Sequence, residues 1–196
     1  MPNRVAQIKR TTKETDISLK LNLDGHADYS IDTGIGFFDH MLELFAKHGG
    51  FDLDITCKGD LKVDSHHTVE DVGLCLGEAI YKALGDKKGI NRYGFFLLPM
   101  DEALVRTVID LSNRPYFILK GKLPSTEING FPPELASDFF HSISDNGKFN
   151  LHIELCYGRN SHHCLEAIFK CFARALSAAC GKSMKDPGIP STKGIL

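Results

Sequence analysis

The feature that most constrains this chain is a six-residue pattern that occurs twice. It reads Ser-His-His-x-x-Glu, and begins at Ser65 and again at Ser161, 96 residues further along a chain of 196. Each copy opens a run of apolar residues with helical spacing. A single His-His pair means little, because a histidine at a helix start is commonly exposed or a capping residue. Two copies at matching helix starts instead predict a duplicated unit that binds metal.

Helix geometry divides the ligands of each copy between two ions. His66 and Glu70 are four residues apart, so they lie on one face and can chelate one ion together. His67 is rotated by about 100° around the helix and cannot easily reach that ion. The second copy offers the same three groups at the same spacing, in His162, His163 and Glu166. Two such helices facing each other across a pseudo-twofold axis or a subunit contact would complete two sites.

The ligand chemistry narrows the choice of metal. Imidazole and carboxylate ligands without thiolate suit a borderline divalent ion such as Mn, Fe, Co or Zn. Cys164 lies inside the second motif, but Thr68 holds the equivalent position in the first. We therefore interpret Cys164 as a packing residue.

A third ligand is expected on the helix that precedes each motif. His40 lies on the first such helix, 26 residues before His66. The corresponding helix of the second half offers Asp138 and His141. Either residue can be the match, and the spacing favours Asp138, which lies 24 residues before His162.

The order of elements repeats between the halves. Apolar periodicity predicts helices at 37–48, 66–84, 134–144 and from 160 or 161 to about 180. Apolar and polar residues alternate across 4–23. Alternation predicts strands at 16–23, 51–57, near 61–63, 95–98, 103–110, 116–120 and 149–156, with a turn at 11–15 and a loop at 123–133. Each half thus ends in strand, helix, strand and His-His helix, which indicates an internal repeat with a pseudo-twofold relation.

Composition excludes several classes of protein. A net charge of -2 and a pI of 6.5 argue against a general nucleic-acid partner or an anionic membrane surface. No apolar run approaches the roughly 18–20 residues of a membrane span. The six cysteines form no C-x-x-C pair, and the first residues show no signal segment. We therefore expect a cytoplasmic protein whose cysteines are ordinary buried thiols.

Several long motifs, in one order, resemble the imidazoleglycerol-phosphate dehydratase family from about residue 8 to residue 196. The matching segments are Gly34-Ile-Gly-Phe-Phe-Asp-His-Met-Leu42, Asp64-Ser-His-His-Thr-Val-Glu-Asp71, Lys88-Gly-Ile-Asn-Arg-Tyr-Gly94, Asp110-Leu-Ser-Asn-Arg-Pro-Tyr116, Asn160-Ser-His-His-x-x-Glu166 and Pro190-Ser-Thr-Lys-Gly-Ile-Leu196.

The resemblance implies an α+β fold, a duplicated α/β sandwich of the ribosomal protein S5 domain 2-like class. Each half pairs a four-stranded sheet with two helices. It also implies one domain over 1–196, made of repeats at about 1–88 and 89–184, with a phosphate-binding tail at 185–196. Such subunits form 24-subunit shells with active sites between subunits, so we expect the same self-association here.

The family's activity is the dehydration of D-erythro-imidazole glycerol phosphate to imidazole acetol phosphate in histidine biosynthesis. The resemblance implies two Mn²⁺ ions per active site, which bind the substrate ring as imidazolate and stabilise charge as it moves through the ring. The implied metal ligands are His40, His66, His67, Glu70, Asp138, His162, His163 and Glu166. The family residue at position 138 is often histidine, so this chain departs from the pattern there.

The resemblance also implies residues that contact the substrate. Glu14 matches the family's acid/base carboxylate, although by itself it would be a solvated turn residue. The implied phosphate-binding positions are Arg92, Arg114, Lys170, Ser191 and Lys193, and guanidinium suits phosphate because it binds in a fork. His48 is expected to touch the substrate. A histidine at a helix end is also adequately explained by its favourable interaction with the helix dipole.

Two rival functions remain open from the residues alone. A two-metal hydrolase using metal-bound hydroxide predicts a bridging water and needs no site for ring nitrogens. A metal-storage or assembly protein predicts saturated coordination shells. It would also lack an anion pocket made by Arg92, Arg114 and Lys193.

Overall fold

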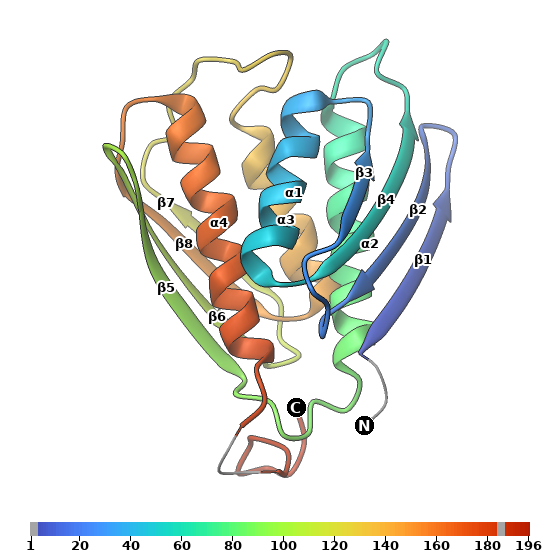
Figure 1. The fold of residues 1–196 in the computed structure, drawn as a ribbon, viewed down its shortest axis with the longest axis vertical. Helices are drawn as coiled ribbons and strands as arrows, with labels where there is room; N and C mark the ends of the chain where they lie inside the picture. Colours follow the sequence, from blue (N-terminus) through green and yellow to red (C-terminus); the bar gives the residue numbers. More distant parts are fainter. Residues whose placement is uncertain (1–3, 184–186) are drawn as a thin grey trace.

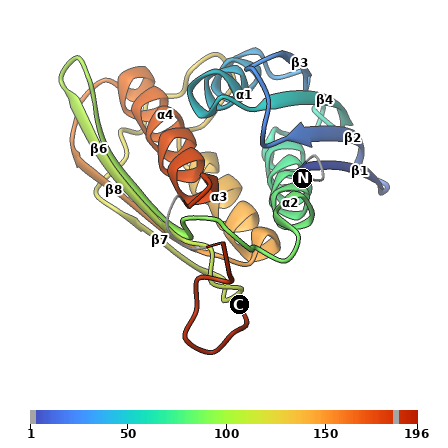
Figure 2. The ribbon, with the colours of Figure 1, turned by 60° about the horizontal axis from the view of Figure 1, so that its bottom comes forward.

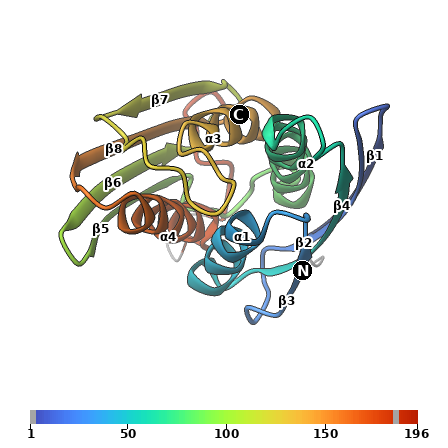
Figure 3. The ribbon, with the colours of Figure 1, turned by 90° about the horizontal axis from the view of Figure 1, so that it is seen from above.

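The structure, a computed structural model, describes residues 4–183 and 187–196. Two four-stranded sheets form its outer layers, and four helices fill the space between them (Figure 1; Figure 3). Each helix presents apolar residues to the interior, so one continuous core runs between the sheets. This is the duplicated α+β sandwich that the sequence predicts.

The first half contains four strands and two helices. Its strands pair in the order β1-β2-β4-β3, with β3 parallel to β4 and the other neighbours antiparallel. The elements are β1 (Val5–Thr11), β2 (Thr15–Asn22), β3 (Tyr29–Asp32), α1 (Gly36–Gly49), β4 (Asp52–Gly59) and α2 (His66–Leu84).

The second half repeats this arrangement. Its strands pair in the order β5-β6-β8-β7, again with one parallel pair, β7 with β8. The elements are β5 (Tyr93–Met100), β6 (Ala103–Asp110), β7 (Tyr116–Lys120), α3 (Leu135–Gly147), β8 (Asn150–Tyr157) and α4 (Ser161–Cys180). Both halves therefore share one topology, as the repeated motif predicts.

Alternating burial explains the strands next to the core. In β2, Ile17, Leu19 and Leu21 are buried while the residues between them are exposed. Val105 and Ile109 of β6 follow the same pattern. Period-2 alternation of this kind places one apolar face on the helices and leaves the other outward.

The most extensive helix packing joins the two halves, although Phe139 of α3 also stacks on Phe169 of α4 within the second half. Helix α1 packs on α4, where the rings of Phe45 and Phe172 stack with centroids 5.6 Å apart. Helix α2 packs on α3 so closely that a Cβ on Gly77 would lie 2.6 Å from the carbonyl oxygen of Ile143. A group on α1 therefore lies beside a group on α4, although their positions in the sequence are far apart.

Two glycines show how the halves align. A Cβ on Gly49 would lie 2.3 Å from the ring of Phe51, and a Cβ on Gly147 would lie 2.3 Å from the ring of Phe149. Both pairs join a helix to the strand that follows it, β4 in one half and β8 in the other. His40 of α1 and Asp138 of α3 lie equally far before these two glycines, so they occupy equivalent positions in the repeat.

Three details of the sequence interpretation are wrong. Residues 61–63 form a turn instead of a strand: the N–H of Val63 donates to Asp60, and Val63 is 68% exposed. The short strand β3 was not predicted, because its four residues carry no buried apolar face. Cys156 is exposed; the other five cysteines are buried, and all six are free.

The two ends of the sandwich carry different segments. Helices α2 and α4 begin with the His-His motifs at the top of Figure 1, whereas the start of β1 and the C-terminal tail lie at the bottom. Figure 2 turns this lower end toward the viewer and shows the last residues beyond the helices. Residues 185 and 186, at the start of the expected tail, lie outside the described residues. Among the described residues, no helix is both long and apolar enough to span a membrane.

Candidate metal centre

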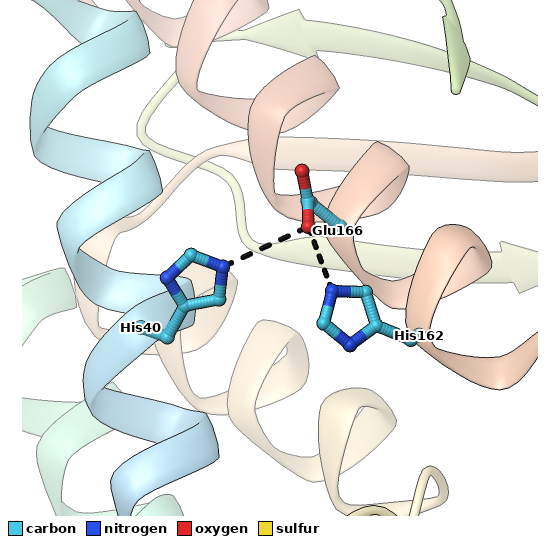
Figure 4. Close-up of side chains that lie close together, drawn as sticks. All are labelled: His40, His162 and Glu166. Carbon is cyan, nitrogen blue, oxygen red and sulfur yellow. Dashed lines mark hydrogen bonds and ion pairs between the residues drawn. The ribbon is translucent and has the colours of Figure 1, made fainter. Parts of the chain in front are cut away.

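Three predicted ligands converge between α1 and α4. His40, His162 and Glu166 each offer a ligand atom within 4.8 Å of the other two (Figure 4). Oε2 of Glu166 lies 2.9 Å from Nε2 of His162 and 3.7 Å from Nε2 of His40. His162 and Glu166 are one turn apart on α4, so helical spacing brings them together. His40 joins them only because α1 packs against α4.

The surroundings of this triad fix its geometry. The side chain of Asn160 caps α4 by accepting a hydrogen bond from the N–H of His163, as the motif predicts. The ring of Phe37 packs edge-on against His162 at 5.4 Å. Both histidines are half-buried and Glu166 is buried, so the ligand atoms lie at the rim of the core.

Glu166 is held as a carboxylate. Burial by itself would raise the pKa of its carboxyl group, but hydrogen bonds from Lys170 and His162 outweigh burial and lower the pKa. The ammonium group of Lys170 contacts the carboxylate oxygen that His162 leaves free. A carboxylate with a lowered pKa beside two imidazoles is a donor set that a divalent ion can occupy.

The repeat places a second, looser cluster between α2 and α3. Oδ2 of Asp138 lies 3.7 Å from Nδ1 of His66, and Glu70 follows His66 by one helical turn. This cluster is the counterpart of the triad, with Asp138 in the place of His40. His141 points elsewhere, since it pairs with Asp145 at 3.5 Å and stacks on Phe117.

His67 faces a different carboxylate from His66. Its Nδ1 lies 3.0 Å from Oδ2 of Asp60, and this hydrogen bond raises the pKa of the imidazole. Its Nε2 lies 3.9 Å from Oε1 of Glu14, in the β1–β2 turn. The two histidines of the first motif therefore point to different neighbours, as the 100° rotation predicts.

His163 is held in the same way by Glu102. Its Nδ1 lies 2.7 Å from Oε2 of Glu102, which raises the pKa of the imidazole. The same hydrogen bond, with one from the N–H of Asn160, lowers the pKa of Glu102 to about 2. Nε2 of His163 lies 3.6 Å from Oδ2 of the exposed Asp101. Asp60 and Glu102 were not singled out from the sequence, because neither belongs to the repeated motif.

Most of the expected phosphate-binding residues lie at the end of the sandwich opposite the His-His motifs. Arg92 bonds the side chain of Asp110 at 2.7 Å and the carbonyl of Pro190 at 2.9 Å, and Arg114 lies 3.8 Å from Asp110. In the tail, the N–H of Lys193 donates to Oγ of Ser191.

The distance from these groups to the triad follows from α4. The backbone N–H of Arg92 donates to the carbonyl of Ala179, in the last turn of that helix. Between Ala179 and His162 the helix rises by about 25 Å, at about 1.5 Å per residue. One subunit therefore cannot bring Arg92 to the metal ligands that it carries itself.

Lys170 and His48 lie nearer to the triad. The carbonyl of His48, in the last turn of α1, is 3.5 Å from a guanidinium nitrogen of Arg174. Burial lowers the pKa of the His48 imidazole, and the nearby Lys170 and Arg174 cations lower it further. His48 is therefore largely neutral at pH 7 and can donate or accept a hydrogen bond.

A cavity of about 610 Å³ opens at the far end of α2. Leu84, Gly89 and Lys182 are among its lining residues, and none of the predicted site residues lines it. The convergent donor atoms, and not this cavity, identify the functional site.

Known proteins resemble this chain over nearly its whole length. A family model described as imidazoleglycerol-phosphate dehydratase matches residues 33–176. The imidazoleglycerol-phosphate dehydratase of Geobacillus sp. (strain WCH70) is 51% identical over 193 residues, covering 98% of this chain and 99% of that protein. The enzyme of the same name from Thermoanaerobacter pseudethanolicus is 53% identical over 193 residues, covering 98% and 100%.

Two solved structures share the fold. The imidazoleglycerol-phosphate dehydratase of Staphylococcus aureus superimposes with a TM-score of 0.83 at 38% identity, covering 91% of this chain and 99% of that one. The dehydratase of Pyrococcus furiosus gives a TM-score of 0.83 at 36% identity, covering 96% and 100%.

Proposed function

The chain belongs to the imidazoleglycerol-phosphate dehydratase family, and from this premise we propose that it works through a di-manganese centre shared between subunits. Family membership makes it a hydro-lyase of histidine biosynthesis. The proposed reaction converts D-erythro-imidazole glycerol phosphate to imidazole acetol phosphate. The observation that carries the proposal is the convergence of His40, His162 and Glu166 from the two halves of the repeat.

The donor atoms present fit a manganese ion. The triad supplies two imidazole nitrogens and one ionised carboxylate, and its repeat counterpart supplies His66, Glu70 and Asp138. We propose that each cluster holds one Mn²⁺, and that His67 and His163 of neighbouring subunits complete the coordination. Carboxylate oxygens suit Mn²⁺, and Asp138 adds one more where the family often has nitrogen.

When bound, the two ions would supply Lewis acidity to the ring nitrogens and so stabilise negative charge in the ring. The chain itself supplies the groups around that step. Glu14, exposed in the β1–β2 turn and 3.9 Å from His67, would accept the proton from the carbon beside the ring, and the substrate hydroxyl leaves as hydroxide, so that the elements of water are lost overall. Lys170 keeps Glu166 ionised and is available to an anionic substrate group beside the triad.

The separation of the metal-binding and phosphate-binding ends of the sandwich supports an active site between subunits. Arg92, Arg114, Ser191 and Lys193 would bind the phosphate, with Lys170 reaching it from the metal side. Arg92 lies about 25 Å from His162 of its own chain, which is too far for one small substrate. A second copy must therefore contribute the phosphate-binding end, and a closed symmetric assembly meets this need for every subunit. We propose the 24-subunit shell of the family.

The location of the reaction is part of the proposal. All six cysteines are free and five are buried. Free thiols are typical of a reducing compartment, which supports the cytoplasm.

The direct test is to incubate manganese-loaded protein with imidazole glycerol phosphate and to assay for the ketone product. We expect product from loaded protein and none after treatment with a chelator. Absence of product from loaded wild type would overturn the proposal.

The same assay separates the rival functions. A two-metal hydrolase would release inorganic phosphate and leave the glycerol chain otherwise intact. A storage protein would take up metal and form neither product.

A further inference from the structure

We propose that Glu102 and Asp60 are positioning residues, which fix the ring orientation and tautomer of His163 and His67. We further infer that this arrangement leaves Glu14 free for proton transfer. The inference rests on the proposed function, because it treats the two histidines as metal ligands. It concerns the groups that orient the metal ligands, and not the ligands themselves or the substrate contacts.

Glu102 is anchored on both of its oxygens. Oε2 lies 2.7 Å from Nδ1 of His163. Oε1 accepts a hydrogen bond from the N–H of Asn160 at 2.8 Å and a longer one from Arg159 at 3.4 Å. These two N–H groups immediately precede α4, so the carboxylate joins the β5–β6 turn to the helix that carries His163. Its position is therefore fixed by groups other than the histidine.

Asp60 reaches the equivalent atom from another direction. It lies directly after β4, and its Oδ2 is 3.0 Å from Nδ1 of His67. Oδ1 is buried and has no hydrogen-bond partner among the described residues. Among the described residues, His67 is thus the one hydrogen-bond partner of this carboxylate.

Both contacts impose one tautomer. An ionised carboxylate can only accept, so the imidazole carries its proton on Nδ1 and keeps the lone pair of Nε2 free. A metal ligand needs that lone pair and a defined ring plane. Partners of this kind commonly orient the histidines of metal sites.

The repeat shows that Glu102 and Glu14 are equivalent positions. Each directly precedes the second strand of its half, at Thr15 of β2 and at Ala103 of β6. From these residues the strands share one alternation, with every second side chain buried. The equivalent glutamates nevertheless face different atoms: Glu102 binds Nδ1 of its histidine, whereas Glu14 lies near Nε2.

The difference follows from Asp60. In the first half Asp60 occupies Nδ1 of His67, so Glu14 is not needed there and its side chain remains exposed. In the second half no carboxylate follows β8, where the chain reads Gly158-Arg159, and Glu102 takes the role. Each half thus has a carboxylate on Nδ1 of its second motif histidine, but the two carboxylates come from different positions in the repeat.

The test uses two isosteric variants with opposite expectations. In Glu102→Gln, the amide oxygen must stay on the N–H of Asn160, so the NH₂ group faces His163. Nδ1 must then accept, and the proton moves to Nε2. In Asp60→Asn, no donor holds Oδ1, so the amide can turn its oxygen to the Nδ1–H of His67 and keep the tautomer.

The readout is binding of Mn²⁺ to the full-length chain after metal depletion, followed by the electron paramagnetic resonance signal of the free ion. We expect Glu102→Gln to weaken binding by about 10–100-fold, and Asp60→Asn to weaken it several-fold less. The ¹⁵N spectrum of histidines in the metal-free protein should show one ring changing tautomer in Glu102→Gln alone. Glu102→Asp should recover part of the affinity, and Glu78→Gln on the surface of α2 should bind as wild type.

Each outcome bears on the inference. Equal losses in Glu102→Gln and Asp60→Asn would mean that charge and not ring orientation matters, and would overturn it. Unchanged affinity and an unchanged ¹⁵N spectrum in a folded Glu102→Gln would also overturn it, while leaving the proposed function intact. Wild type that binds no Mn²⁺ would instead overturn the metal centre itself.

Discussion

Oδ2 of Asp138 lies 3.7 Å from Nδ1 of His66, and these two residues are the repeat equivalents of His40 and His162. The two clusters therefore differ in one ligand, a carboxylate on α3 against an imidazole on α1. We expect Asp138→Ala to lose one of two bound Mn²⁺ ions, because His66 and Glu70 alone hold an ion weakly. Metal content by mass spectrometry measures this. His141→Ala on the same helix is the control, and loss of an ion there instead would assign the ligand to His141.

The histidines that point away from these clusters should tie metal binding to assembly. We expect His67→Ala and His163→Ala to lose metal and activity, and to dissociate the proposed shell, because we propose that each supplies a ligand between subunits. Sedimentation velocity with and without Mn²⁺ measures the assembly. A wild-type shell that stays intact after complete metal removal would contradict the structural role of the metal.

The phosphate-binding end should act separately from the metal. Arg114→Ala and Lys193→Ala are expected to raise KM by about tenfold or more, since a hydrogen bond to a charged group contributes about 1.5–3 kcal/mol. Bound Mn²⁺ should remain at the wild-type level. Steady-state kinetics at saturating metal is the measurement, with Lys120→Ala on the outer face of β7 as the control. A KM that does not change in either variant would remove these residues from the site.

Close packing of α2 on α3 predicts an effect on stability alone. In Gly77→Ala, the new Cβ would lie 2.6 Å from the carbonyl oxygen of Ile143 and 2.9 Å from the N–H nitrogen of Gly147. Backbone atoms cannot move aside cheaply, so we expect a loss of about 1–3 kcal/mol in the free energy of unfolding. Gly36→Ala is the matched control, because its Cβ would meet only the side chain of Asn129 at 3.9 Å. Denaturant unfolding that ranks the two variants equally would contradict this account of the packing.

Lys87 is a buried cation with a distinct dependence on pH. Its ammonium group donates to the carbonyl of Leu111 and to the side chain of Asn113, and no carboxylate is among these partners. Burial lowers its pKa from 10.5 to about 8. Between these values the unfolded chain binds one proton more than the folded one, so stability rises with pH across that window.

The comparison with Lys87→Met isolates this effect, because other groups titrate in both proteins. Relative to the variant, we expect the wild type to gain up to about 3 kcal/mol of unfolding free energy between pH 8 and pH 10.5. Urea unfolding of both proteins at pH 7 and pH 10 measures the change. A constant difference would mean that Lys87 stays charged in the folded state.

Much of the fold was predictable because its signals are local. The alternation of β2 and β6 and the spacing of α2 and α4 are visible within a few residues, and several predicted bounds agree with the structure. Strand β3 was not predicted because its four residues are mostly exposed and show no alternation of buried and exposed side chains. The sequence predicts a strand at 61–63 because Leu61 and Val63 flank a polar residue, but both apolar side chains are exposed and the segment forms a turn.

The sequence by itself determined that His162 lies beside Glu166, because i and i+4 spacing brings two side chains together on any helix. Only the tertiary structure decided which distant groups join them. His40 reaches Glu166 because α1 of one half packs on α4 of the other, and Asp138 reaches His66 because α3 packs on α2. Glu102 and Asp60 meet their histidines through loops that no local period describes. Such contacts depend on how helices and sheets pack over long sequence separations, so they cannot be inferred from a pattern of neighbouring residues.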